Sequence, residues 1–596
     1  MPSLRIAKMG YRRCLSGCVT GLYGCRCKQN ERGHTKISER IWFIFLIFSV
    51  LLTFCNMYLW LVSTNEEGLL YIGFWNKYGL DLKWHFMFRT ASYALFGYPF
   101  ALLIFAALHM IVKEYLHLNI VHKVLLVLVD LITATILTLS LFYTHFLWHF
   151  IPLSVKFFGP FLHLIAVVVM TLCSWFVAGA FGTLERKEQY LDVVYQEEFG
   201  TLLPQEKDLT QDKSFTKPLR QRIQDELISP NQVIEFFLPK EKKVSEGKHS
   251  RVKRSKTRDI CVWYYLLLLT LYLTPLLIKS PCIVDQKKLS DKPKLFAHKG
   301  AEHLAPENTM IAFQRAVNDC NVYGLESDVR ISLDGVHFCL HDDTFERTTN
   351  IKDVSPGRIH TKAEEFSSAD LGVLDAGSWF LERDPFGTVQ ELTDEQRELY
   401  ASQKIPLMTD LLDIAKKYRL NVLFDLRAPP EGHPHENDFV ECTKEKIKEN
   451  GFEESDMDIW KAPDGPHYVV YIKKFDPRNL VNVYNNISFE SIRENKEKGI
   501  STNVWTINKR WVFSLFWCGQ TFSVTTSYCR DLKDMDDPSW QLTNTHYLIM
   551  WIMYDVVSFI WVTIFLVCQI RRKRKRLLSA ATDNVSGRVA TFEIQE

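Results

Sequence analysis

Six long apolar runs constrain this chain more than any other feature of its sequence. They cover Ile41–Val62, Phe88–Val112, Val124–Phe146, Phe158–Phe181, Val262–Ile278 and Tyr547–Ile570. Each run is close to the roughly 20 residues that a helix needs to cross a bilayer. Six buried core helices, four of them in the first third of a chain, would be unusual. The runs therefore predict an α-helical multi-span membrane protein, with the fifth and shortest run as the weakest span.

Positive charge sets the expected orientation of these spans. Nine Lys and Arg residues precede Ile41, sixteen lie within 184–259, and the run Arg571–Arg576 directly follows the last span. Because Lys and Arg concentrate on the cytoplasmic side, both termini are predicted to be cytoplasmic and the stretch after the fifth span extracellular. We expect a multi-pass protein of the plasma membrane. The basic runs are interpreted as topology determinants that can attract anionic membrane lipid, with no nucleic-acid partner.

The predicted domains follow from the spans and the charge. They are a cytoplasmic basic and cysteine-containing tail (1–40), four transmembrane helices (41–183), a cytoplasmic loop (184–260), a fifth transmembrane helix (261–279), an extracellular domain (292–538), a sixth transmembrane helix (546–570) and a cytoplasmic tail (571–596).

Two features of the outer region fit an oxidising, extracellular setting. Six cysteines lie there, namely Cys282, Cys320, Cys339, Cys442, Cys518 and Cys529. Disulfides form and persist outside the cell, and six cysteines allow 15 pairings between which the sequence does not choose. Asn486 begins an Asn-Ile-Ser acceptor for N-glycosylation.

The outer domain alternates strands with helices over about 250 residues, which favours a (β/α)8 TIM barrel. A doubly wound sheet fits the alternation as well, but the expected Gly-rich phosphate loop is missing from the sequence. Residues 350–404 interrupt the rhythm and are interpreted as an insertion after the second barrel strand. Long loops at that end of a barrel shape the active site.

The segment GLESDV carries two carboxylates, Glu326 and Asp328, two residues apart. On a strand this spacing places both on the same face. Adjacent carboxylates repel each other unless a cation lies between them, and hard oxygen ligands suit Ca²⁺ or Mg²⁺. Asp425, in the strand pattern NVLFDLR, is the candidate third ligand.

Two histidines bracket this pair. His298 ends the first predicted strand, and His341 follows the second. Such a pair can serve as general acid and general base in a displacement at phosphorus, while a metal neutralises phosphate charge. Lys299 and Arg427 would add cationic contacts to a phosphodiester substrate.

The order of these motifs resembles the glycerophosphodiester phosphodiesterase family, in its six-transmembrane branch. The family pattern runs HRG, PENT, ExD, DG, HD and RTT, and this chain has HKG, PENT, ESD, DG, HD and RTT. IPLMTDLL and VWTIN resemble later motifs of the family, so the resemblance covers the whole outer domain.

The resemblance implies a TIM barrel with a divalent cation, usually calcium, held by Glu326, Asp328 and Asp425. It implies His298 and His341 as the acid/base pair, and a mechanism in which a glycerol hydroxyl attacks phosphorus and water opens the cyclic phosphate. Trp505 would line the glycerol pocket. The implied function is an ectoenzyme that hydrolyses glycerophosphoinositol, glycerophosphocholine or a lipid-linked glycosylphosphatidylinositol-type phosphodiester.

Four residues depart from the family pattern. Lys299 replaces an arginine and loses its bidentate fork, Asp425 replaces a glutamate, Arg427 replaces a lysine, and Ser527 stands where relatives carry aspartate. These departures keep open an alternative, a catalytically weak or inactive barrel that acts as a membrane signalling or scaffold protein. A transporter or channel, and a phospholipase D-like activity on the same barrel, are further alternatives.

Overall fold

The computed structural model describes residues 37–63, 82–111, 116, 118–143, 148–174, 263–462 and 467–592. The predicted loop 184–260 and residues 1–36 of the amino-terminal tail lie outside this part of the chain. The contacts divide the chain into two units, which are described separately: residues 1–157 with 280–543, and residues 158–279 with 544–596.

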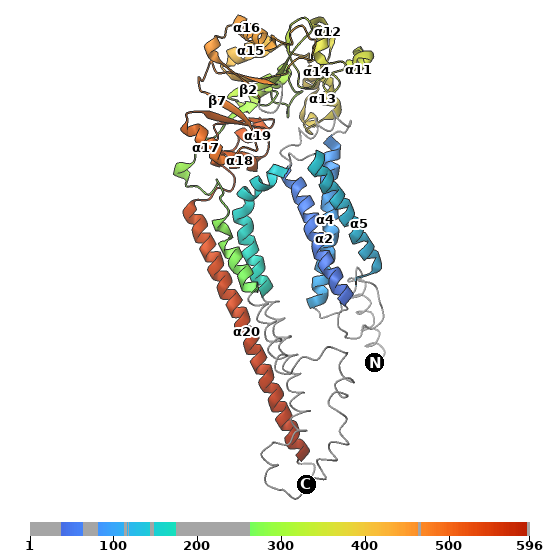
Figure 1. The fold of residues 1–596 in the computed structure, drawn as a ribbon, viewed down its shortest axis with the longest axis vertical. Coiled ribbons are helices and arrows are strands. Elements are labelled where there is room, and N and C mark those ends of the chain that lie inside the picture. Colours follow the sequence, from blue (N-terminus) through green and yellow to red (C-terminus); the bar gives the residue numbers. More distant parts are fainter. Residues whose placement is uncertain are drawn as a thin grey trace. The chain divides into compact units, whose positions relative to one another are not determined.

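Apolar helices occupy the predicted spans (Figure 1). Among the described residues, five helices are long and apolar enough to cross a membrane: Ser38–Val62, Met87–Ala107, Ile120–Leu141, Phe150–Ser174 and Asn544–Cys568. The fifth predicted span is the exception, because its described part is a shorter apolar helix, Trp263–Leu276. Pro275 lies there in a 3-10 turn, Thr274–Leu276, and proline cannot donate the next helical hydrogen bond.

Three of these helices form a small bundle in the first unit. Helix α2 (Ile37–Val62) packs against α4 (Leu82–Ile111) and α5 (Ile120–Tyr143). The hydroxyl of Ser49 donates a hydrogen bond of 2.7 Å to the buried Asp130, which joins α2 to α5. Asp130 therefore joins two apolar helices, a structural role for an acidic side chain in a predicted membrane span.

The domain predicted at residues 292–538 is built on one sheet, in the order β5-β6-β4-β2-β1-β9-β8-β7. Six neighbouring strands of this path run parallel: β4 (Asn421–Leu426), β2 (Gly324–Ile331), β1 (Lys294–Ala297), β9 (Ser523–Thr526), β8 (Ser501–Trp505) and β7 (Leu480–Tyr484). The helices between these strands include α10 (Met310–Cys320), α15 (Met408–Tyr418), α16 (Phe439–Glu449), α17 (Phe489–Glu497) and α18 (Arg510–Cys518), and α19 (Cys529–Lys533) follows the last strand. This arrangement confirms the predicted alternation.

The strand β6 (Tyr468–Ile472) departs from an all-parallel barrel. It runs antiparallel to both β4 and β5 (Met457–Lys461). Only six residues connect β5 to β6. A parallel crossover needs a dozen or more residues, and a connection this short therefore produces an antiparallel hairpin. The expectation of eight uniformly parallel strands is therefore wrong at this point.

The predicted insertion 350–404 is ordered and rich in short helices. It holds α11 (Ile351–Val354), α12 (Ser368–Val373), α13 (Ser378–Arg383) and α14 (Asp394–Ala401), gathered on one side of the domain in Figure 1. Buried side chains such as Phe366 and Phe380 supply its core. Serine and threonine caps begin α12 and α14 through capping boxes. The insertion thus packs as part of the domain.

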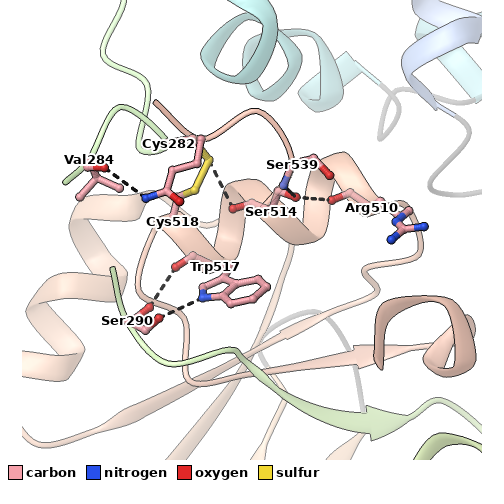
Figure 2. The surroundings of a disulfide bond; sticks show 9 residues. Cys282, Val284, Ser290, Arg510, Ser514, Trp517, Cys518 and Ser539 are labelled. Carbon is pink, nitrogen blue, oxygen red and sulfur yellow. Dashed lines mark hydrogen bonds between the residues drawn. A yellow bond between two sulfur atoms is a disulfide. The ribbon is translucent and has the colours of Figure 1, made fainter. Parts of the chain in front are cut away.

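Two disulfides fasten the ends of the domain. Cys282 pairs with Cys518 of α18, and Cys320 at the end of α10 pairs with Cys529 at the start of α19. Figure 2 shows the first, where Trp517 and Ser290 exchange two hydrogen bonds of 3.0 Å beside it. The segment that enters the domain also bridges the segment that leaves it, through Ile283 and Leu542. Both chain ends of the domain are therefore held at one place.

Candidate active site

The predicted metal-binding carboxylates lie on one face of two adjacent strands, β2 and β4. This group of Glu326, Asp328 and Asp425 is called the carboxylate edge below. Asp328 of β2 lies in register with Asp425 of the parallel neighbour β4, and Glu326 precedes Asp328 on the same face of β2. Residues in register on adjacent parallel strands point to the same side of the sheet. Glu326 and Asp328 are buried, whereas the side chain of Asp425 is 28% exposed. The structure therefore brings together the three residues that the sequence singled out.

Arg427 lies between two of these carboxylates. Its Nη2 is 2.8 Å from an oxygen of Asp328 and 2.8 Å from an oxygen of Asp425. The amide of Asn308 donates a further hydrogen bond of 3.2 Å to Asp328. Burial would raise the pKa of the Asp328 carboxyl, but the charges of His341, Arg427 and Lys299 outweigh burial and hold that pKa far below its usual range. Asp328 is consequently an obligate anion at the centre of the edge.

His298 follows β1 and faces the same edge. Its Nδ1 lies 2.5 Å from Glu302, and its Nε2 lies 3.9 Å from Glu326. Ser527 donates a short hydrogen bond to Glu302, which fixes that carboxylate. Burial alone would lower the pKa of His298, but the two glutamates outweigh burial and raise it to about 9. The ring can therefore carry a proton beside the carboxylate edge.

His341 follows β3 (His337–Cys339) and is oriented by its own acid. Its Nδ1 lies 2.8 Å from Asp342. Arg347 holds Asp342 from the other side, at 2.6 Å, and binds Glu307 through two hydrogen bonds of 2.7 Å. Burial lowers the pKa of His341, with the charge of Lys299 acting in the same direction. The two histidines thus sit in environments that move their pKa values in opposite directions.

Lys299 does not reach an open surface. Its side chain is 1% exposed, and its ammonium lies 3.5 Å from Glu307 and 3.9 Å from Glu302. Its backbone has a φ of 50°, and its N–H donates a hydrogen bond of 2.8 Å to Glu326. Lys299 therefore orients one predicted metal ligand through its backbone and compensates buried acids through its side chain. Its predicted contact with substrate stays a prediction.

Trp505 ends β8 and is half-buried, with its ring packed edge-on against Tyr484 at a centroid distance of 5.2 Å. Its predicted place in a glycerol pocket stays a prediction.

Sequence reasoning missed the residues that support the predicted set. Glu302, Glu307, Asn308, Asp342 and Arg347 were not singled out, although each contacts a predicted site residue or its partner. The signal was present in the motifs PENT, HD and RTT, which contain four of these five residues. The residues that pair with one another come from different motifs, so the motifs alone did not show which charged side chains form ion pairs.

The charge balance tests whether a divalent cation fits this edge. Six carboxylates meet here: Glu302, Glu307, Glu326, Asp328, Asp342 and Asp425; the permanent cations are Lys299, Arg347 and Arg427. With all six carboxylates ionised, three negative charges would remain, and a protonated His298 would leave two. Burial and the nearby Asp328 raise the pKa of Glu326 to about 8, as expected for a carboxylate that lacks a full counter-charge.

The donor set and the charge excess fit a hard divalent cation, which prefers carboxylate oxygens. The oxygens of Glu326, Asp328 and Asp425 are not all within 4.8 Å of one another, and Arg427 occupies the space between the two aspartates. The type and charge of the ligand atoms therefore fit a divalent cation, whereas the distances between the three carboxylates are too long for one ion in this arrangement.

The chain is similar to known proteins over most of its length. The sequence profile described as the glycerophosphoryl diester phosphodiesterase family matches residues 298–535. Mouse glycerophosphodiester phosphodiesterase domain-containing protein 4 is 30% identical, over 98% of this chain and 89% of its own length. Human glycerophosphoinositol inositolphosphodiesterase GDPD2 is 29% identical, over 91% of this chain and 90% of its own length. An Oleispira antarctica phosphodiesterase solved with sn-glycerol-3-phosphate is 21% identical with a TM-score of 0.29, covering 40% of this chain and 95% of its own.

A largely parallel, barrel-like sheet with two histidines flanking a carboxylate edge is the architecture of a phosphodiester hydrolase. The chain belongs to the glycerophosphoryl diester phosphodiesterase family.

Replacing Arg347 should test the buried charge network. Arg347→Gln would leave Glu307 and Asp342 buried without their shared partner, so we expect a loss of about 3–5 kcal/mol in the free energy of unfolding. Denaturant unfolding of the full-length protein in detergent measures it. Arg493→Gln is the matched control, because Arg493 is 54% exposed and pairs with an exposed Glu490. That control should change stability by less than about 1 kcal/mol. Equal effects of the two substitutions would contradict the network.

Proposed function

We propose that this protein is a membrane-anchored ectoenzyme that hydrolyses glycerophosphodiesters, with His298 and His341 as its acid/base pair. The observation that carries the proposal is the placement of the two histidines. Each is held by its own carboxylate, Glu302 or Asp342, and the Glu326–Asp328 pair lies on the strand between them. An oriented base held by a third group is the arrangement that proton transfer requires.

A divalent cation, Ca²⁺ or Mg²⁺, would be held by Glu326, Asp328 and Asp425 and would neutralise phosphate charge. The chain's own residues do the remaining work. Arg427 is proposed to contact the phosphodiester, since its guanidinium already lies at the accessible end of the carboxylate edge beside Asp425. One histidine would accept a proton from the attacking hydroxyl, and the other would donate a proton to the leaving oxygen. Trp505 is proposed to face the glycerol moiety.

The substrate is proposed to be glycerophosphoinositol, glycerophosphocholine or a glycosylphosphatidylinositol-type linkage. Relatives support the glycerol-containing class, and a glycerophosphoinositol inositolphosphodiesterase is among them. Attachment to a membrane would favour a lipid-linked member of that class.

The proposed orientation places the catalytic domain outside the cell, both termini in the cytoplasm and the protein in the plasma membrane. Three observations support it. In the part of the chain that the structure describes, five helices are long enough to span a bilayer, two disulfides join cysteines of the domain, and Asn486 is exposed at a turn before α17. Disulfides are characteristic of oxidising compartments.

A second candidate, an inactive barrel with a scaffold role, has one observation in its favour. Arg427 already satisfies both Asp328 and Asp425, so it competes with any cation for those oxygens. Metal binding without turnover would identify this case.

Substitution of either catalytic histidine tests the proposed chemistry. We expect His298→Ala and His341→Ala each to lower turnover of glycerophosphoinositol by about 10²–10⁴-fold, the range of general acid–base catalysis. Phosphorus NMR of the reaction of the full-length protein identifies and counts the products. His360→Ala is the control, since the His360 side chain is 87% exposed, and it should retain activity. Unchanged turnover in both catalytic variants, or no turnover by the wild type on any of the three substrates, would overturn the proposal.

Glycosylation of Asn486 tests the orientation. In cells, the full-length protein should lose apparent mass on treatment with an N-glycosidase, and Asn486→Gln should abolish that loss. Electrophoresis of the expressed protein measures both. An Asn437→Gln variant, which alters an asparagine outside any acceptor motif, serves as the control. Absence of a glycan at Asn486, together with labelling of Lys448 only after the cell membrane is permeabilised, would place the domain on the other side.

A further inference from the structure

A second cluster of metal-ligating side chains lies outside the candidate active site. His435 and Asp438 are in the loop that follows β4, and Cys442 is in the first turn of α16. Nδ1 of His435 is 3.1 Å from an oxygen of Asp438 and 3.5 Å from Sγ of Cys442. Among the residues that the structure describes, this is the group of three such side chains whose ligand atoms all lie within 4.8 Å. Bringing these atoms onto one ion therefore requires only small movements.

The histidine presents the correct nitrogen to the cluster. Nε2 of His435 packs over the β2–β3 turn, where a Cβ placed on Gly335 would meet it at 2.8 Å. The opposite ring nitrogen, Nδ1, consequently faces Asp438 and Cys442. The backbone N–H of His435 also donates a hydrogen bond of 3.1 Å to the ring of the buried His433. The packing of Nε2 against the β2–β3 turn therefore leaves Nδ1 as the ring nitrogen that faces Asp438 and Cys442.

The six cysteines of the domain are of three kinds. Four of the six predicted outer cysteines form disulfides, and Cys339 is a buried thiol. Cys442 is neither: it is partly exposed and lies against an imidazole and a carboxylate. A thiol in such a setting can act as a metal ligand, since coordination holds it as thiolate.

We propose that His435, Asp438 and Cys442 form a Zn²⁺ site. The mixed sulfur, nitrogen and oxygen donor set suits zinc, whereas Ca²⁺ and Mg²⁺ take oxygen ligands. Three protein ligands leave a fourth position for water. The ion would tie the loop after β4 to α16, and that loop begins with Arg427, which bridges Asp328 and Asp425. The zinc site stands on these three side chains alone and does not depend on the proposed catalytic function.

Alkylation of the full-length protein in detergent tests the site directly. The protein is stripped of metal, supplied with excess Ca²⁺ to occupy oxygen sites, and treated with iodoacetamide with and without equimolar Zn²⁺. Peptide mass mapping then reports modification of each cysteine separately, so thiols elsewhere in the chain do not confuse the result. We expect Zn²⁺ to slow the alkylation of Cys442 by about tenfold or more. Equal rates with and without zinc would overturn the proposal.

Co²⁺ substitution gives a second readout with matched variants. Thiolate-bound tetrahedral Co²⁺ should produce a sulfur-to-metal charge-transfer band in the wild type, and Cys442→Ser should lose the share of that band due to Cys442. Asp438→Asn should weaken Co²⁺ binding by about tenfold, and Glu441→Gln, an exposed acid on the same helix outside the cluster, should leave it unchanged. Identical Co²⁺ spectra and affinities in the Cys442→Ser and wild-type proteins would contradict the site.

Discussion

The buried pairing of Arg347 with Glu307 and Asp342 supports the rest of the active-site architecture. One guanidinium connects the loop before α10 to the loop after β3, with three of its hydrogen bonds at 2.6–2.7 Å. Arg347 holds Asp342, which orients His341. Arg347 also binds Glu307, the carboxylate that pairs with Lys299 next to His298 in the sequence. A buried ion pair adds little net stability over an apolar alternative, but its loss leaves uncompensated charge. The main role of the network is therefore to hold Asp342, Glu307 and His341 in fixed positions.

Much of the site could be predicted because it depends on local geometry. The two-residue spacing of Glu326 and Asp328 determines their shared face, and the register of β2 with β4 then places Asp425 beside Asp328. The long-range charge pairs could not be predicted in the same way. Arg347 and Glu307 are 40 residues apart, and no local rule assigns one to the other. The burial of Lys299 depends on the same contacts, so its position was equally hidden.

The fold was predicted best where amphipathic helices and strands alternate with regular spacing. The hairpin β5–β6 was missed as a pair, since its strands are joined by a connection too short for a helix and their pattern alone does not give direction. The insertion 350–404 reads as polar loop, yet four short helices and buried aromatics fill it. Capping residues mark these helices only weakly, because each is eight residues or shorter and gains its stability from packing.

The carboxylate edge is short of positive charge, and we expect it to need a divalent cation in order to act on a phosphodiester. The most direct measurement is phosphorus NMR of glycerophosphoinositol incubated with the chelator-treated full-length protein, before and after Ca²⁺ or Mg²⁺ is restored. We expect no product before the ion is added and turnover afterwards. Turnover that continues unchanged in the chelated protein would contradict this expectation.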